Sequence, residues 1–358
     1  MLKGLNEQQI EAVKREGNIL LTACPGSGKT RALTHKIAYE LEKNIGSKKV
    51  IIAVTFTNRA ADEIKKRIRE FNSDDTNLWT GTIHSFCLEW IIRPYMCYLD
   101  ELKNGFSISD EFNSERILDD LKKEYGLTYY DSVSTRYLPN GEKEESVYRN
   151  LIDEYHEILA NEKLIDFDQI LHYSYQLLSN YPKIGITLKN LFHLICVDEY
   201  QDTQQLQYSI LAAIMKEKSG NCKIFMVGDS DQAIYGSLGG TAKSHEEIEE
   251  EFKSVFSKME LSGNYRSNQQ IINYNKNFQT TDIIVEAFGH NASDSATITY
   301  NKTIHKDKGS EKLPIERLPR ESTNLSDAVK YFFFRTSWTN DSSKKKKSTA
   351  SMAPEVVE

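Results

Sequence analysis

The sequence predicts an α/β fold in which a parallel sheet carries helices on both faces. Several short apolar runs, such as 50–54, 194–197 and 224–227, are bounded by polar residues. Runs of this kind are typical of parallel strands that are buried on both faces. Helical apolar spacing follows one of them at Ala61, Ile64 and Ile68. Strands that alternate with helices in this way form a parallel sheet.

The composition is that of a globular chain with room for a sizeable core. The 358 residues are 39% hydrophobic and 27% charged, and this length suits about two or three domains. No apolar run approaches the roughly 20 residues of a membrane span, so we expect no membrane association. The five cysteines are scattered without metal-ligand spacing, which favours reduced thiols and a cytoplasmic protein. The net charge of -7 neither supports nor excludes DNA as a partner.

The stretch from Asn18 to Arg31 carries the strongest chemical signal. An apolar run stops there at a Gly-rich turn, and a helix pattern follows. Successive backbone N–H groups in such a turn form a concave anion site, and the helix N-terminus adds partial positive charge. Lys29 is expected to reach the β- and γ-phosphates, and the Thr30 hydroxyl to bind Mg²⁺. The stretch therefore predicts a nucleoside triphosphate site. Upstream, Gln9 lies in an ordinary amphipathic helix pattern, yet a glutamine at this place can read an adenine edge.

The ends of the next two apolar segments predict a second kind of contact. The run 50–54 ends in Thr-Phe-Thr-Asn at 55–58, and another turn-to-helix junction contains His84. Open α/β sheets bind ligands at the carboxyl ends of their strands, and a hydroxyl-rich aromatic turn suits phosphates and a stacked base. A lone histidine is more often structural than functional, so the residues alone leave both interpretations of His84 open.

Two acidic residues end the run 194–197, after a Tyr-rich stretch from 96 to 160 that we expect to be a mostly helical insertion. Downstream of a phosphate loop, Asp198 would hold the hydration water of the metal and Glu199 would deprotonate the attacking water. Gln232 follows the run 224–227 and can contact the γ-phosphate. A charged amphipathic helix is expected from Lys243 to Glu260.

An aromatic residue and a cation stand side by side after that helix. Tyr265 can stack on adenine, and Arg266 can neutralise charge on the transferring phosphoryl group. Without the other segments, these two residues would be interpreted as part of a solvated loop.

Together these segments resemble the superfamily 1 DNA helicases of the UvrD/Rep/PcrA type, from Leu5 to about Ile272. Residues 197–203, Val-Asp-Glu-Tyr-Gln-Asp-Thr, are similar to a signature very specific to this family. Segments 5–9, 23–30, 55–63, 81–85, 227–236 and 264–267 resemble its other motifs in the expected order.

The resemblance implies a RecA-like P-loop fold and a set of site residues. Nucleotide-binding residues would be Gln9, Ala23, Gly26, Ser27, Gly28, Lys29, Thr30, Arg31 and Tyr265. Catalytic residues would be Lys29, Asp198, Glu199, Gln232 and Arg266, with Thr30 and Asp198 at Mg²⁺. DNA-contacting residues would be Phe56, Thr57, Asn58, His84 and Tyr235.

Two departures from the family pattern bear on domain organisation. Ser237 and Leu238 stand where the family has an aromatic residue, which stacks a DNA base, and an arginine. The family's later motifs, on a second RecA-like domain, have no counterpart after Arg266. We therefore expect a RecA-like domain from 1–95 plus 161–280, a helical insertion at 96–160, and a partial second domain with a disordered tail at 281–358.

The expected activity is Mg²⁺-dependent ATP hydrolysis stimulated by single-stranded DNA. The resemblance alone implies 3′-to-5′ movement and the unwinding of tailed duplex DNA. The alternative is a DNA-sensing regulatory ATPase subunit that signals to a partner, such as a nuclease in a DNA repair or phage-defence complex. Ser237 and the missing motifs favour that alternative. A small-molecule kinase is nearly excluded by Asp198, Glu199 and Arg266.

Overall fold

The computed structural model describes residues 2–71, 74–128, 130–144, 147–233, 240–276, 279, 283–288, 296–302, 311–313, 337–338 and 348–352. They form two compact units. The first comprises Met1–Leu21, Thr30–Val227 and Tyr235–Met259, and the second comprises Thr22–Lys29, Gly228–Ile234 and Glu260–Glu358. The three-part division expected from the sequence stays a prediction, and most of its last part, 281–358, lies outside the described residues.

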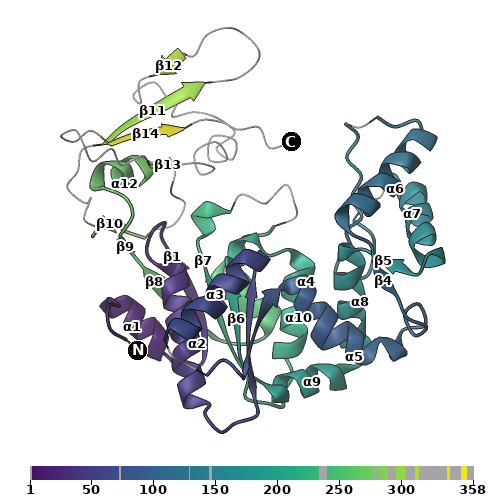
Figure 1. The fold of residues 1–358 in the computed structure, drawn as a ribbon, viewed down its shortest axis with the longest axis horizontal. Coiled ribbons are helices and arrows are strands. Elements are labelled where there is room, and N and C mark those ends of the chain that lie inside the picture. The colour runs from purple at the N-terminus through teal and green to yellow at the C-terminus, as the bar shows by residue number, and fades with distance from the viewer. Residues whose placement is uncertain are drawn as a thin grey trace. The chain divides into compact units, whose positions relative to one another are not determined.

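A six-stranded sheet forms the centre of the fold (Figure 1). In order across the sheet, its strands are β3 (Leu78–Thr82), β2 (Val50–Thr55), β6 (Phe192–Asp198), β7 (Lys223–Gly228), β1 (Asn18–Ala23) and β8 (Phe256–Leu261). From β3 to β7, each strand pairs in parallel with the next. The last residues of β1, β7 and β8 belong to the second unit. The predicted α/β class with a parallel sheet is confirmed.

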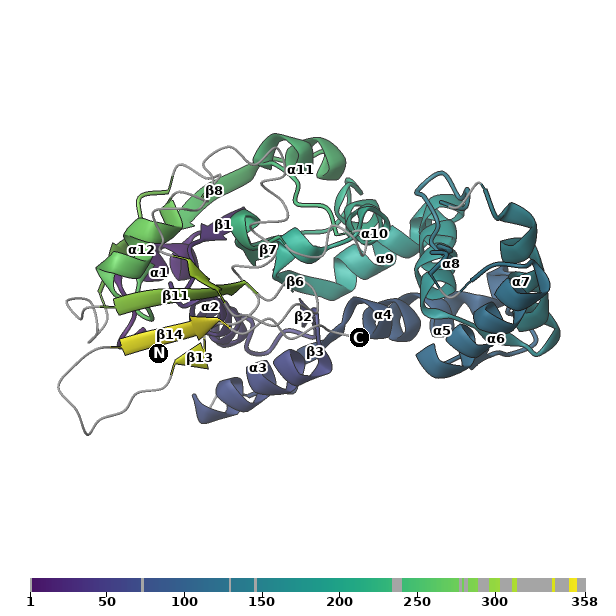
Figure 2. The same cartoon turned by 90° about the horizontal axis from the view of Figure 1, so that it is seen from above.

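Helices cover both faces of this sheet (Figure 2). The crossover helices α2 (Lys29–Lys43) and α3 (Asn58–Glu70) lie on one face, and α10 (Gln205–Met215) and α11 (His245–Phe252) lie on the other. The chain moves across the sheet in one direction from β1 to β3 and in the opposite direction from β6 to β8. Because crossovers between parallel strands are right-handed, the helices of these two halves lie on opposite faces of the sheet. Helix α3 buries Ala61, Ile64 and Ile68, the three residues whose spacing predicts it.

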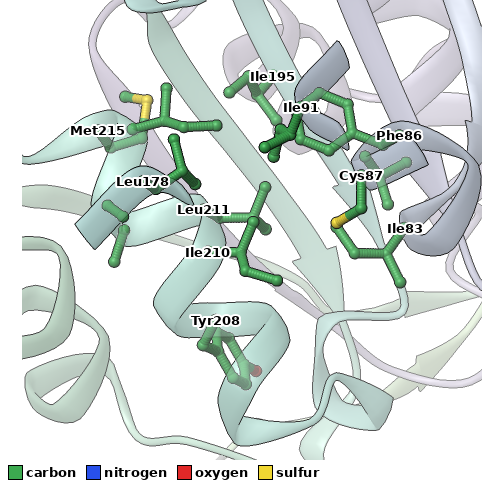
Figure 3. Packing of buried hydrophobic residues seen from close by; sticks show 14 of the residues in the cluster. Ile83, Phe86, Cys87, Ile91, Leu178, Ile195, Tyr208, Ile210, Leu211 and Met215 are labelled. Atoms are coloured by element: carbon green, nitrogen blue, oxygen red, sulfur yellow. The ribbon is translucent and has the colours of Figure 1, made fainter. Parts of the chain in front are cut away.

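Alternate residues of each strand divide the core between the two faces. Ile52 and Val54 of β2 and Ile195 of β6 belong to the cluster that packs against α10 and α11. Figure 3 shows part of this cluster, in which side chains of α10 lie close to those of α4 (Ile83–Phe86) and β6. Ile51 and Ala53 point to the opposite face and are also fully buried. Burial on both faces explains why the strands read as continuous apolar runs.

A buried lysine ties helix α1 (Glu7–Lys14) to the first unit. Lys36 Nζ donates to the carbonyl oxygens of Val13 at 3.1 Å and Arg15 at 2.8 Å, and it pairs with Glu40 at 2.8 Å. The last carbonyl groups of a helix have no partner within the helix and carry partial negative charge. Lys36 therefore stabilises the C-terminal end of α1, the helix that also contains Gln9.

The chain between β3 and β6 is mostly helical. Its elements are α4, a π-helical segment Cys87–Ile92, α5 (Arg93–Tyr95), β4 (Ser107–Ile108), α6 (Glu111–Glu124), α7 (Arg149–Asn161), β5 (Leu164–Ile165), α8 (Phe167–Asn180) and α9 (Pro182–Leu191). Helices α6 and α7 share a small core around Leu151 and Tyr155. Both views place these two helices at the end of the first unit, on the far side of α8 from the sheet (Figures 1 and 2).

The prediction of a helix from Lys243 to Glu260 is wrong for the second half of this range. Helix α11 ends at Phe252, and Lys253 adopts a left-handed φ of 47° there. The following residues form β8 instead, with Phe256 and Leu261 buried at its two ends. Charged side chains between them remain compatible with a strand at the edge of a sheet, which solvent reaches.

The second unit has a small core of its own. Cys24, in the turn after β1, packs with Ile272 of α12 (Gln269–Asn275) and with Ile283 and Val285. Strand β9 (Gly263–Asn264) pairs in parallel with β10 (Glu286–Ala287). Four further strands, β11 (Ala296–Lys302), β12 (Glu311–Leu313), β13 (Ser337–Trp338) and β14 (Ser348–Met352), form a sheet in the order β12-β11-β14-β13.

No helix in the described part of the chain is both long and apolar enough to cross a membrane. All five cysteines are free, and only Cys97 among them is exposed.

Candidate functional site

The turn after β1 has the backbone of an anion-binding loop. Gly26 and Gly28 adopt positive φ angles of 74° and 84°, which residues with a side chain rarely adopt. Ser27 N donates to the Cys24 carbonyl oxygen at 3.2 Å and closes the turn. Lys29 then begins α2. A phosphate in this loop would therefore meet glycine backbone, a lysine and the N-terminus of a helix.

The second unit contains both this loop and the buried carboxyl group of Asp229. Asp229 follows β7 and is 2% exposed. Burial raises its pKa to about 7, although Lys29 favours the charged form. Its Oδ2 accepts a hydrogen bond from Gln232 Nε2 at 2.5 Å, and its Oδ1 accepts one from the Asp231 N–H at 3.1 Å. Asp229 therefore holds the side chain that is expected to contact the γ-phosphate.

The turn that carries Tyr265 and Arg266 is built against the same loop. Tyr265 N donates to the Gly26 carbonyl oxygen at 3.0 Å. A Cβ added to Gly26 would lie 2.7 Å from Arg266 Cβ. Both side chains of the pair are exposed, so a ligand in the loop can reach them. The structure thus brings together the phosphate loop and the two residues predicted to act on its nucleotide.

A pocket of about 230 Å³ lies in the first unit, at the ends of β2, β3 and β6. It joins two groups that the sequence predicts separately. Phe56 and His84 are expected to contact DNA, whereas Asp198 and Glu199 are expected to act on ATP, and all four line the pocket. Its other polar lining residues are Thr55, Thr82, Asp202, Thr203, Gln204 and Gln207.

Glu199 has a strained backbone. Its φ of 51° and ψ of 50° are left-handed, a conformation that costs a non-glycine residue roughly 1–3 kcal/mol and that clusters at functional sites. Glu199 N donates to Asp198 Oδ1 at 3.2 Å, and Glu199 Oε2 accepts from Gln201 Nε2 at 3.0 Å. These bonds hold the two acidic residues at the end of β6 in a defined arrangement.

His84 is neutral at physiological pH. Burial lowers its pKa to about 4. Its ring packs edge-on against the ring of Phe167, with 5.3 Å between the two ring centroids. Phe56 and Phe167 are 51% and 45% exposed. A neutral imidazole offers one donor and one acceptor, and exposed aromatic faces can stack on bases. The role of His84 in contacting DNA stays a prediction.

Two other predicted DNA contacts, Thr57 and Asn58, do not line this pocket. Thr57 and Asn58 are exposed at the start of α3, where Thr57 Oγ1 caps the helix by accepting from the Ala60 N–H at 3.2 Å. Tyr235, like Ser237, lies outside the described residues.

Two predicted nucleotide contacts take part in other interactions. Gln9 is 3% exposed, and its Oε1 accepts from the Asn6 N–H at 3.1 Å in a capping box at the start of α1. Its role in reading adenine stays a prediction. Arg31 lines a separate pocket of about 450 Å³ with Lys3 and His35.

Sequence reasoning missed Asp229 and Asn264 as site residues. Asp229 follows a buried strand, and Asp198 ends one. An acidic residue at the carboxyl end of an apolar run could therefore have identified Asp229 as well. Asn264 stands at the start of a turn, where asparagine side chains often accept backbone hydrogen bonds.

Comparison with known proteins bears on the identity of this site. The profile of the UvrD/REP helicase N-terminal domain matches residues 5–132 and 123–253. The ATP-dependent DNA helicase UvrD1 of Mycobacterium tuberculosis (strain ATCC 25618 / H37Rv) is 32% identical over 300 residues, which cover 76% of this chain and 38% of that protein. The ATP-dependent DNA helicase PcrA of Staphylococcus aureus (strain NCTC 8325 / PS 47) is 30% identical over 295 residues, covering 76% and 39%.

Among solved structures, the Pif1 helicase from Candida albicans aligns with 76% of this chain and 44% of that chain, at 16% identity and a TM-score of 0.38. The chain spans less than half the length of the curated relatives that it matches. The profile match extends over residues 5–253 of 358 and includes the phosphate loop, the acidic pair and Gln232. The chain therefore belongs to the UvrD/REP helicase N-terminal domain family.

Proposed function

We propose that this chain is the ATP-binding part of a DNA helicase that hydrolyses ATP with Mg²⁺ and moves 3′ to 5′ on single-stranded DNA. The observation that carries the proposal is the pocket that Phe56 and His84 share with Asp198 and Glu199. A translocase must couple DNA contacts to ATP hydrolysis, and side chains that are predicted to serve each purpose line one pocket here. The direction of movement rests on the resemblance to the UvrD/Rep/PcrA type.

The phosphate loop supplies binding and charge stabilisation. Its backbone N–H groups and Lys29 bind the β- and γ-phosphates, while Tyr265 stacks on adenine. Gln232, held by Asp229, contacts the γ-phosphate. Arg266 stabilises the negative charge that spreads over the transferring phosphoryl group.

The acidic pair supplies the proton transfer. Glu199 orients the attacking water and takes its proton. The Thr30 hydroxyl and Asp198 are oxygen donors of the kind that suits Mg²⁺, which usually keeps several waters and binds one or two carboxylates together with substrate phosphates. Among the described residues, no group of three or more His, Cys, Asp and Glu side chains could hold a metal ion by itself, and a site of this type does not need such a group. Bound Mg²⁺ would neutralise the phosphate charge.

Single-stranded DNA acts through the shared pocket. Phe56 stacks on a base in this pocket, and His84 forms hydrogen bonds there as a neutral imidazole. Phe167, which packs against His84 outside the pocket lining, can stack on a neighbouring base. Because Glu199 lines the same pocket in a strained conformation, DNA there changes the alignment of the catalytic carboxylate. This link would make hydrolysis depend on DNA.

A second candidate function is a DNA-sensing regulatory ATPase that signals its nucleotide state to a protein partner. Ser237 favours it, because the resemblance places a base-stacking aromatic residue at that position. Unwinding of a tailed duplex by the full protein separates the two: the helicase unwinds it, and the regulatory subunit does not.

The test of the catalytic assignment compares two substitutions. Lys29→Ala should abolish ATP binding, since it removes the positive charge from the β- and γ-phosphates. Glu199→Gln should bind ATP like the wild type and lose turnover, because the amide has a similar shape but is a poor base. ATP hydrolysis at the wild-type rate by Glu199→Gln would show that the assigned role is wrong.

A further inference from the structure

Asn264 is a buried residue whose side chain closes the turn of Tyr265 and Arg266. It ends β9 and is 3% exposed. Its Oδ1 accepts hydrogen bonds from the N–H groups of Arg266 and Ser267, both at 2.8 Å. Its carbonyl oxygen accepts one from the Phe288 N–H at 2.8 Å. A short side chain that accepts from the backbone two and three residues ahead sets the path of a turn.

The same asparagine lies against the phosphate loop. A Cβ added to Gly26 would lie 2.8 Å from Asn264 Oδ1, in addition to its approach to Arg266 Cβ. These atoms lie close to the backbone, so they cannot swing away as the tip of a long side chain can. The Tyr265 N–H bond to Gly26 and the Cys24 N–H bond to the Leu261 carbonyl oxygen at 3.0 Å join the two segments further.

We propose that Asn264 is a positioning residue that holds Tyr265 and Arg266 on the phosphate loop. The adenine-stacking ring and the arginine are thereby presented together to a nucleotide whose phosphates occupy that loop. This inference rests on the proposed function, because it takes ATP as the ligand. Asparagine suits the position, since alanine has no acceptor and aspartate would add negative charge beside the phosphates.

The proposal predicts a loss that depends on the base of the ligand. Without the Asn264 acceptor, the turn no longer fixes Tyr265, so ADP should bind more weakly. Pyrophosphate has no base for Tyr265 to stack on. Arg266 is proposed to act on the charge that develops as the phosphoryl group is transferred, which neither ligand undergoes, so the affinity for pyrophosphate should change little. Base stacking of this kind corresponds to roughly 5- to 150-fold in affinity.

The experiment measures ADP and pyrophosphate affinities by titration calorimetry for wild type, Asn264→Ala and Asn268→Ala. Asn268 is a matched control: it is 1% exposed, and its Oδ1 accepts one backbone bond, from the Ile271 N–H at 3.0 Å. Asn264→Ala should lower the ratio of ADP to pyrophosphate affinity, and it should add little to the effect of Tyr265→Ala. Asn268→Ala should leave the ratio unchanged. Asn264→Asp keeps both acceptor bonds and should retain the ratio, even where its charge weakens both ligands.

Two results would overturn the proposal: equal weakening of ADP and pyrophosphate by Asn264→Ala, or full additivity with Tyr265→Ala. If Asn264→Ala does not fold, Asn264→Gly replaces it, and an unchanged ratio there has the same meaning, since glycine also lacks the side-chain acceptor. Failure of wild type to bind either ligand would instead contradict the proposed function.

Discussion

The Nη2 atom of Arg31 lies 2.7 Å from the position that a Cβ on Gly4 would occupy. Gly4 also has a positive φ of 84°, so glycine is needed here for the backbone as well as for space. Only the tip of a flexible side chain stands in the way, and it can move without unfolding the protein. A side chain at Gly4 would therefore displace the guanidinium of a predicted nucleotide contact.

Gly4→Ala should weaken ATP binding through this displacement, and Gly46→Ala should not. Gly46 has a nearly equal φ of 81°, but no atom lies within 4 Å of a Cβ built there. Backbone strain is thus matched between the variants. Titration of both with ATP, alone and combined with Arg31→Ala, measures the effect. Equal affinities of the two glycine variants would show that the contact between Gly4 and Arg31 is irrelevant to the nucleotide.

The raised pKa of Asp229 predicts how stability depends on pH. The folded state keeps a proton on this carboxyl up to a pKa of about 7, whereas an unperturbed aspartate has a pKa of 3.8. The stabilisation from this proton is complete below that lower pKa and is lost as pH rises through about 7. Asp229→Asn cannot ionise. Relative to this variant, wild type should lose stability between about pH 4 and about pH 7, by up to roughly 4 kcal/mol.

Urea unfolding without nucleotide, repeated across this pH range, measures the difference. Parallel stability curves for wild type and Asp229→Asn would show that the buried carboxyl does not titrate in the folded protein as described.

Phe56 tests the DNA side of the pocket. Phe56→Ala should weaken binding of single-stranded DNA by about 1–3 kcal/mol, because an exposed ring that stacks on a base is lost. Phe112→Ala is the control, since Phe112 lies on α6 and is 78% exposed. Fluorescence anisotropy with a labelled oligonucleotide measures both. Basal ATP hydrolysis should survive in both variants, and its loss in Phe56→Ala would indicate a structural role instead.

The sequence predicts those helices and strands that are marked by the spacing of apolar residues within the element itself. Helix α3 follows from the spacing of Ala61, Ile64 and Ile68, which are buried in the fold. The strands follow from burial on both faces. Strand β8 could not be found this way, because its charged residues fit a helix as well as an edge strand.

The site depends on contacts between residues far apart in the sequence. Val54 of β2 and Val197 of β6 are partners in register, and this pairing brings Phe56 and Asp198 to one pocket. The order of strands is set by packing across a long insertion, which periodicity does not report. The roles of Asp229 and Asn264 likewise arise from burial beside the phosphate loop and the turn packed on it.

We propose that DNA contacts and ATP hydrolysis are coupled through the pocket of Phe56, His84, Asp198 and Glu199. The most direct test measures steady-state ATP hydrolysis by the purified protein with and without single-stranded DNA, for wild type and for Phe56→Ala at saturating DNA. We predict that DNA stimulates the wild-type rate, and that Phe56→Ala keeps the basal rate but loses most of this stimulation. A wild-type rate that DNA does not change, or full stimulation of Phe56→Ala, would contradict the account.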